Sequence, residues 1–127
     1  QFICMGSQED ESAKKILDYL ENKYKQGVLF IRDEKKDGKF RWQQGEGKRP
    51  PVGSLVRAAS DFVFIPSRFE PCGLVQFEGW LFGSLAIGAN TGGLADTIKT
   101  KGDHFNGYLF ERDGDDQTAS MVIAKAL

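Results

Sequence analysis

The sequence predicts an α/β fold, a doubly wound sheet of parallel strands connected by helices. Short apolar runs of strand length alternate with segments of helical periodicity along the 127 residues. The chain has 15 glycines, against about 9 expected from an average content of roughly 7%, and they gather at predicted turns. Because parallel strands need crossover connections, this alternation favours right-handed strand–helix–strand units.

The start of the chain is predicted to form a strand, a helix and a second strand. Residues 2–5 are a short apolar run, and residues 28–32 are another. Residues 9–25 carry apolar side chains at helical spacing, with charged residues elsewhere. That apolar face consists of Ala13, Ile16, Leu17, Leu20 and Tyr24.

Residues 33–51 interrupt the alternation. Residues 33–39 read as a charged turn, residues 40–44 as half of a small hairpin, and residues 45–51 as loop. A connection of this length in a compact α/β domain is either a functional loop or an insertion, so we expect a loop or hairpin insertion over 33–51.

The alternation resumes after this segment. Its predicted elements are a helix over 53–60, a strand over 61–65, a helix over 74–82, a strand over 84–89, a turn and short helix over 91–99, a strand over 107–110 and a helix over 115–127.

Composition excludes several classes of protein. Hydrophobic residues at 40% and charged residues at 28% are typical of a globular domain, not of a disordered chain. The net charge of −1 favours neither nucleic acid nor an anionic membrane as partner, and the longest apolar runs are too short for a transmembrane helix. Cys4 and Cys72 lack the number and spacing of a disulfide framework or a metal site, which favours a reducing, intracellular setting.

The length fits one domain at most, residues 1–127. The chain begins directly in an apolar run, as a chain cut at the edge of a strand would. We therefore expect a partial domain, a fragment of something larger.

Two turns follow predicted strands, at residues 66–74 and 90–94, so both should lie at the carboxyl edge of the sheet, where such folds bind ligands. The start of the next helix offers the N–H groups of Gly73, Leu74 and Val75 to a phosphate or diphosphate. Gly73 has no side chain and lets an anion approach the backbone. Gly92 and Gly93 are candidates for a second set of donors.

Two glutamates bracket the first turn. A carboxylate accepts several hydrogen bonds and suits adjacent hydroxyls on a sugar or ribose, so Glu70 and Glu78 are candidates for gripping hydroxyls on either side of a bound anion. The alternative for Glu78 is a solvated helix face, and for Glu70 an ordinary turn residue.

Other candidates have structural explanations. Cys72 is either a reactive thiol at a helix N-terminus or, as favoured here, a small filler residue. His104 reads as a solvated loop residue. Phe40 and Trp42 suit hairpin packing more than stacking on a base, and residues 48–49, Lys-Arg, read as a solvated charge pair.

The strings PSRFEPCGL at 66–74 and TGGLADT at 91–97 resemble the donor-site region of bacterial glycogen synthases and plant starch synthases. These are retaining glucosyltransferases of the GT-B fold. The resemblance covers roughly residues 1–127 and is weakest across 33–52. It implies the Rossmann-like C-terminal half of a GT-B glycosyltransferase.

The resemblance implies a role for each site residue. Glu70 would be catalytic and would bind the donor glucose, with Cys72 and Gly73 lining the same sugar. The diphosphate would lie against two segments, Gly73–Leu74–Val75 and Thr91–Gly92–Gly93. Glu78 would bind the ribose, a position where typical glycogen and starch synthases need not have a glutamate.

The implied donor is ADP-glucose or UDP-glucose, and the implied acceptor is the nonreducing end of an α-glucan. No cofactor and no metal are expected. The protein would be cytoplasmic, or plastidial in a plant or alga. The family's basic diphosphate clamp and its acceptor-side N-terminal domain do not lie in this sequence, and Arg68 does not replace that clamp. We therefore expect the fragment alone to be inactive.

Two alternatives stay open. One is another retaining GT-B transferase with a small acceptor, of the sucrose- or trehalose-phosphate type. The other is a non-catalytic module that binds a nucleotide sugar.

Overall fold

The computed structural model describes residues 1–6, 11–32, 35–36, 39–40, 50–111 and 117–126. The chain divides into two compact units, Gln1–Val56 and Arg57–Leu127. Whether the two make a single domain stays a prediction. None of the helices in the described ranges is long and apolar enough to cross a membrane.

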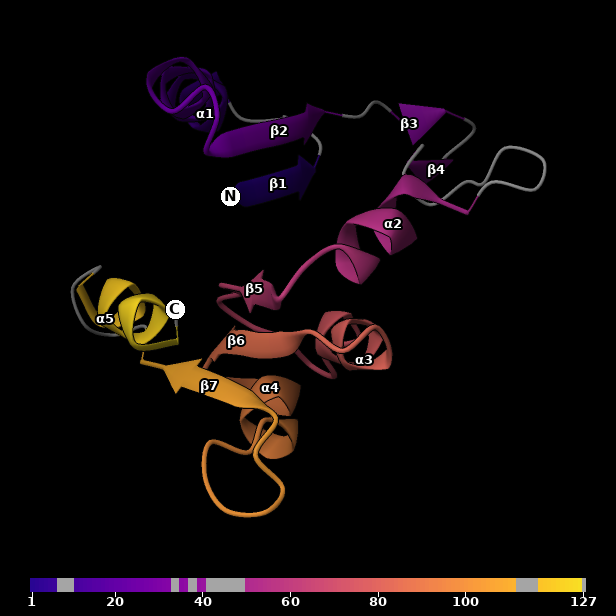
Figure 1. Ribbon diagram of the computed structural model, residues 1–127, viewed down its shortest axis with the longest axis vertical. Coiled ribbons are helices and arrows are strands. Elements are labelled where there is room, and N and C mark those ends of the chain that lie inside the picture. The colour runs from indigo at the N-terminus through magenta and orange to yellow at the C-terminus, as the bar shows by residue number, and fades with distance from the viewer. Residues whose placement is uncertain (7–10, 33–34, 37–38, 41–49, 112–116, 127) are drawn as a thin grey trace. The chain divides into compact units, whose positions relative to one another are not determined.

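The first unit contains the predicted strand–helix–strand arrangement. Strands β1 (Phe2–Gly6) and β2 (Val28–Arg32) pair in parallel, with Phe2 opposite Val28, and are connected through helix α1 (Glu11–Lys23) (Figure 1). A hydrogen bond to the side chain of Glu21 also connects α1 to β2. The Phe30 N–H donates to Glu21 Oε1 at 2.6 Å.

A small hairpin follows. Strands β3 (Lys35–Lys36) and β4 (Lys39–Phe40) pair antiparallel, so the pairing begins before the predicted 40–44 strand. Residues 41–49 lie outside the described residues, which leaves the rest of the predicted insertion untested. Helix α2 (Val52–Ala58) contains the boundary between the two units.

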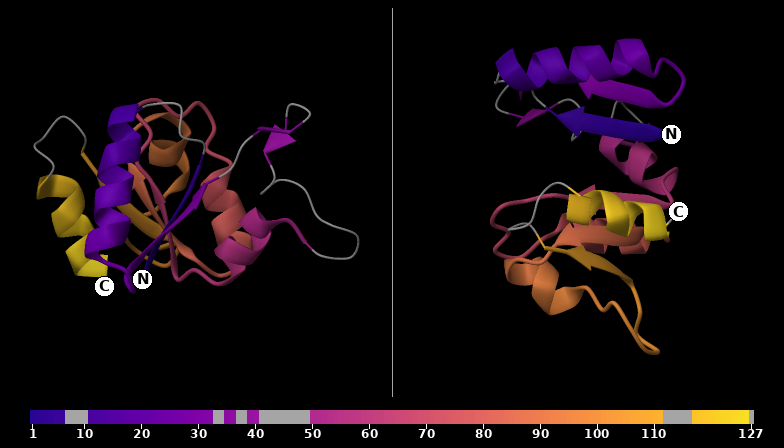
Figure 2. Two further views of the ribbon diagram at one scale, coloured as in Figure 1. Left: turned by 90° about the horizontal axis from the view of Figure 1, so that it is seen from above. Right: turned by 90° about the vertical axis from the view of Figure 1, so that its left-hand side faces the viewer.

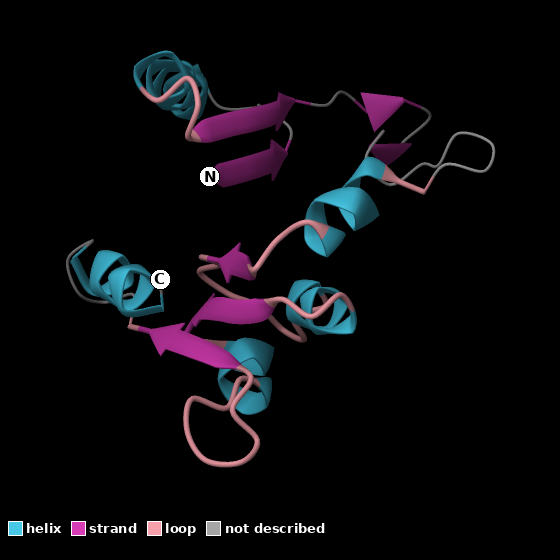
Figure 3. Ribbon diagram, viewed as in Figure 1, coloured by secondary structure: helices cyan, strands magenta, loops and turns pink. Residues whose placement is uncertain are grey.

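The second unit alternates strands and helices throughout, as Figure 3 shows by colour. Its elements are β5 (Phe62–Ile65), α3 (Val75–Leu81), β6 (Leu85–Ala89), α4 (Gly92–Thr97), β7 (Gly107–Phe110) and α5 (Gln117–Ala126). The strands form one parallel sheet in the order β5-β6-β7. Each element lies within a few residues of its predicted range.

Helices cover both faces of this sheet (Figure 2). On one face α3 and α4 cover a core of Val63, Ile65, Ala86, Leu94 and Ile98. On the other face α5 packs against a core of Ile87, Ala89 and Phe110. The doubly wound prediction is confirmed in this unit.

The parallel register decides where the two turns predicted to bind ligand lie. Ile65 pairs with Gly88, so β5 and β6 end side by side. Neighbouring strands are about 4.8 Å apart, and the segments that leave their carboxyl ends therefore begin as neighbours. Residues 66–74 and 90–94 are these segments.

Candidate functional site

The loop between β5 and α3 is held by the carboxylate of Glu70. Glu70 Oε1 accepts a hydrogen bond from the Gly73 N–H at 3.1 Å, and Oε2 accepts one from Ser67 Oγ at 3.1 Å. Gly73 has a φ of 65°, a left-handed conformation that favours glycine. The half-buried Glu70 therefore stabilises its own turn, as the turn-residue alternative expects. Its carboxylate lies at the carboxyl edge of the sheet.

The turn between β6 and α4 interlocks with this loop. The Gly93 N–H donates to the backbone oxygen of Glu70 at 2.9 Å. A Cβ on Gly92 would overlap the same oxygen, and a Cβ on Gly93 would overlap the backbone of Cys72. The two turns that the sequence places at one edge therefore touch, backbone against backbone.

The predicted N–H donors are partly occupied. Gly73 donates to Glu70 Oε1, and Gly93 donates to the Glu70 carbonyl. Across the described part of the chain, the N–H groups of Leu74, Val75 and Gly92 donate to no protein acceptor. These N–H groups are the donors that an anion would find.

Thr91 stands at the start of α4 with extended backbone, and its side chain makes no capping hydrogen bond. Cys72 is exposed, which does not support its interpretation as a small filler residue. Both residues thus present side chains beside the interlocked backbone. Their predicted contacts with glucose and diphosphate stay predictions.

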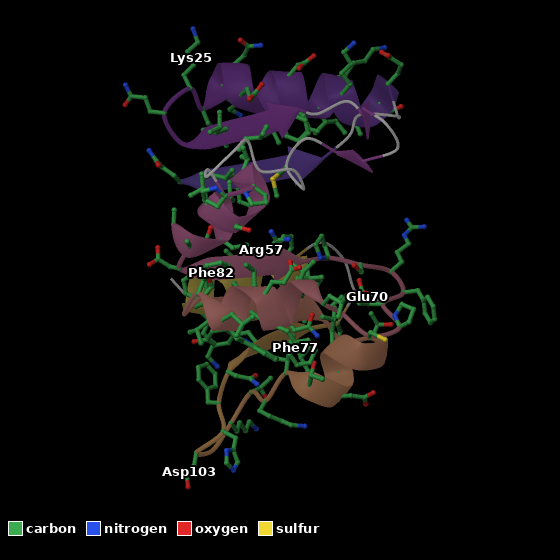
Figure 4. All side chains as sticks on the ribbon, turned by 90° about the vertical axis from the view of Figure 1, so that its right-hand side faces the viewer. Lys25, Arg57, Glu70, Phe77, Phe82 and Asp103 are labelled. Carbon is green, nitrogen blue, oxygen red and sulfur yellow. The ribbon has the colours of Figure 1, made fainter. Side chains whose placement is uncertain are left out.

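Glu78 pairs with a residue of another helix, not with the two turns. Its Oε2 forms an ion pair with Arg57 Nη2 of α2 at 2.6 Å, and the two side chains are 48% and 21% exposed. The solvated-face alternative is therefore incomplete, because this exposed carboxylate has a specific cationic partner. Figure 4 labels Glu70 at one end of α3 and Arg57 along its length.

The sequence analysis missed two side chains behind the turns, Gln76 and Thr97. Gln76 is fully buried, and its Nε2 donates to Cys72 O at 3.3 Å and to Thr97 Oγ1 at 3.1 Å. Glycines stand three positions before and after Gln76, at 73 and 79. Residues three positions apart lie on the same face of a helix, so the two glycines indicate that this face packs closely against its neighbours. This spacing was the sequence signal that could have identified Gln76.

The remaining candidates differ in their exposure. His104 is exposed, as a solvated loop residue would be, and Arg68 is exposed as well. Cys4 is half-buried, and burial raises the pKa of its thiol. The side chain of Phe40 and residues 42, 48 and 49 lie outside the described residues. Over the described ranges no three acidic, cysteine or histidine side chains gather as a metal site would require.

Known proteins share both the sequence of this region and its fold. Glycogen synthase 1 of Bradyrhizobium diazoefficiens is 60% identical over 57 residues, which is 45% of this chain and 12% of the relative. Granule-bound starch synthase 1 of Arabidopsis thaliana is 45% identical over 62 residues, 49% of this chain and 10% of the relative. Both of these relatives are synthases of an α-glucan store by name, one of glycogen and one of starch. No family model matches this chain.

A solved starch synthase has the same arrangement of elements. The catalytic domain of starch synthase IV from Arabidopsis thaliana, bound to ADP and acarbose, superposes with a TM-score of 0.75 at 27% identity. The match covers 99% of this chain and 24% of that one. The Rossmann-like fold predicted for a glycogen or starch synthase is thereby confirmed. The chain spans about a tenth of the length of the curated relatives cited here.

Proposed function

We propose that this chain is the donor-binding part of a glucosyltransferase that transfers glucose from a nucleotide-glucose to the nonreducing end of an α-glucan. The observation that carries the proposal is the backbone interlock between the Glu70 loop and the Gly92–Gly93 turn. The starch synthase of the same fold is bound to ADP and acarbose, a nucleotide and a saccharide, which supports these ligand classes.

In this proposal Glu70 binds the hydroxyls of the donor glucose. A carboxylate offers about four lone-pair sites, and the bonds from Gly73 and Ser67 use two of them. The remaining sites point to sugar hydroxyls as partners. Cys72 and Gly73 line the same sugar.

The diphosphate lies against N–H groups in the same proposal. Leu74, Val75 and Gly92 carry N–H groups that have no protein acceptor among the described residues, and the start of α3 adds the positive end of its peptide dipoles. The Thr91 hydroxyl makes no capping hydrogen bond to α4 and is a further donor in this proposal. No metal and no cofactor are part of the proposal.

Glu78 is proposed to bind the ribose together with Arg57. The ion pair uses Oε2 of Glu78 and leaves Oε1 for a ribose hydroxyl. Because Arg57 holds the carboxylate of Glu78 in one position, the ribose is bound by the ion pair and not by the glutamate alone.

Transfer also requires an oriented acceptor and stabilisation of the leaving diphosphate in a closed, dry cleft. The residues described here supply donor binding. We therefore propose that the 127-residue piece alone has no measurable transferase activity and binds donor weakly.

The test uses the full-length protein that carries this chain. Glu70→Ala is expected to lower elongation of glycogen from ADP-glucose or UDP-glucose by about a hundredfold or more. Glu70→Gln keeps an acceptor for the Gly73 N–H, so it separates lost chemistry from a collapsed loop. Glu11→Ala, on the exposed surface of α1, is the matched control and should elongate at the wild-type rate. Unchanged elongation in Glu70→Ala would show that the site assignment is wrong.

A transferase with a small acceptor is the second candidate, and Glu78 is the observation that favours it. Supplying fructose, glucose 6-phosphate and glycogen side by side separates the two. Transfer to glycogen alone supports the glucan synthase, and transfer to a small sugar supports the second candidate. Donor binding without transfer to any acceptor would indicate a non-catalytic module.

A further inference from the structure

A buried polar pair, Gln76 and Thr97, lies behind the two interlocked turns. Gln76 Nε2 donates to the carbonyl oxygen of Cys72 in the first turn and to Thr97 Oγ1 on α4. Thr97 Oγ1 in turn donates to the carbonyl oxygen of Gly93 in the second turn at 2.5 Å. A continuous line of side-chain hydrogen bonds thus runs from one turn to the other.

The orientation of the Gln76 amide follows from its partners. Thr97 has a single hydroxyl hydrogen, and Gly93 O receives it, so Thr97 Oγ1 must accept from Gln76. Cys72 O is also an acceptor only. Both hydrogens of the amide are therefore committed, and swapping its oxygen and nitrogen would break both bonds.

The amide oxygen is left over. Gln76 Oε1 is buried and has no hydrogen-bond partner among the described residues. An unmade hydrogen bond in the interior is unfavourable, and an apolar side chain of the same shape would avoid it. The two directed bonds, not a gain in stability, therefore account best for an amide at this place.

The packing leaves the amide little freedom. A Cβ on Gly73 would lie 2.5 Å from both Nε2 and Oε1 of Gln76, so the amide lies directly beneath the Gly73 backbone. Gly73 is the residue whose N–H binds the Glu70 carboxylate. A displacement of Gln76 would thus reach the position of that carboxylate.

We propose that Gln76, acting through Thr97, is a positioning residue that sets the separation between the Glu70–Gly73 loop and the Thr91–Gly93 turn. Its effect on catalysis rests on the proposed function, in which one turn binds the glucose and the other the diphosphate. The bond broken in transfer joins those two groups, and small misplacements of a reacting centre lower rates steeply.

The test compares three variants in the full-length protein that carries this chain. Gln76→Met keeps length and removes the bonds, Thr97→Val keeps shape and removes the hydroxyl, and Thr97→Ser keeps the hydroxyl as matched control. The first two should lose at least about tenfold in kcat/KM for nucleotide-glucose, and Thr97→Ser should stay near wild type. Gln76→Met removes the orphaned oxygen but also the donor to Cys72 O, so the two effects oppose each other and its unfolding midpoint should stay close to that of the wild type. Activity within twofold of wild type in Gln76→Met, or a loss explained by its unfolded fraction, would overturn the proposal.

A second measurement does not depend on catalysis. The Gly93 N–H bonds across the turns to Glu70 O, so its hydrogen exchange reports their separation directly. Exchange should be at least about tenfold faster in Gln76→Met and unchanged in Thr97→Ser. Unchanged exchange in Gln76→Met overturns the positioning role whatever the reaction is. Faster exchange together with full activity in Glu70→Ala would leave the positioning role standing and remove the proposed function.

Discussion

Replacing Gly93 by alanine tests the contact between the two turns most directly. Gly93 is buried at the start of α4, and a Cβ there would lie 2.5 Å from the carbonyl carbon of Cys72 and 2.7 Å from its Cα. These atoms belong to the backbone and cannot rotate away as the end of a side chain can. Gly93→Ala therefore forces the turns apart.

The cost follows from two contributions. Forcing a methyl group into a well-packed site typically costs about 1–3 kcal/mol. Stretching the hydrogen bond from the Gly93 N–H to Glu70 O adds about 0.5–1.5 kcal/mol. The expected loss in free energy of unfolding is thus about 1.5–4.5 kcal/mol.

Two other glycines provide matched controls. Gly83 has a φ of 87° and no atom within 4 Å of a built Cβ, so Gly83→Ala tests backbone strain alone and should cost about 1–2 kcal/mol. Gly27 has ordinary contacts at 3.7 and 3.9 Å and no left-handed φ. Gly27→Ala should change stability by less than about 1 kcal/mol in either direction.

The assay is urea unfolding followed by tryptophan fluorescence for Gly93→Ala and Gly83→Ala, and by circular dichroism for Gly27→Ala, which lies in the first unit. The chain has 2 tryptophans, and a Trp42→Phe background leaves Trp80 as the reporter of the second unit. A loss for Gly93→Ala no larger than that for Gly83→Ala would refute the backbone contact between the turns.

Three further predictions use other contacts of the chain. Trp80→Phe removes the hydrogen bond from Nε1 to Asn106 O at 2.9 Å and should lower the free energy of unfolding by about 1 kcal/mol beyond the change in ring size, measured by urea unfolding with circular dichroism. Ser84→Ala removes the buried hydroxyl whose single hydrogen is shared between the carbonyl oxygens of Ser60 and Arg57, and should cost about 1–3 kcal/mol in the same assay. Burial raises the pKa of the Cys4 thiol, so at pH 8 a smaller fraction of it is thiolate than in an unburied cysteine. Cys4 should therefore react with a disulfide reagent more slowly than the exposed Cys72, and its rate should still rise above pH 9. Equal rates at pH 8 would contradict the burial of Cys4.

The order and type of the elements could be predicted because local signals decide them. Apolar runs bounded by glycine and polar residues gave β5 and β6, and helical spacing with a closing glycine gave α3. The parallel pairing of β5 and β6 followed from the helix between them. The adjacency of the turns at residues 66–74 and 90–94 could therefore be predicted from the sequence.

The contacts inside the site could not be predicted in the same way. Arg57 and Glu78 come from different helices, and no sequence pattern pairs a lone arginine with a glutamate so far along the chain. The engagement of the Gly73 N–H by Glu70 depends on a left-handed φ that the sequence permits but does not require. Cys72 was misjudged because exposure depends on what the neighbouring elements cover, which composition does not reveal.

The hydrogen bonds that hold the Glu70 carboxylate have a consequence for the entropy of ligand binding. A free glutamate side chain loses up to about 2 kcal/mol of rotamer entropy when it is ordered. Gly73 and Ser67 already restrict this carboxylate in the folded chain without ligand. The entropy cost of ordering the Glu70 side chain is therefore part of the free energy of folding. A ligand that binds these oxygens does not have to offset that cost with its binding free energy.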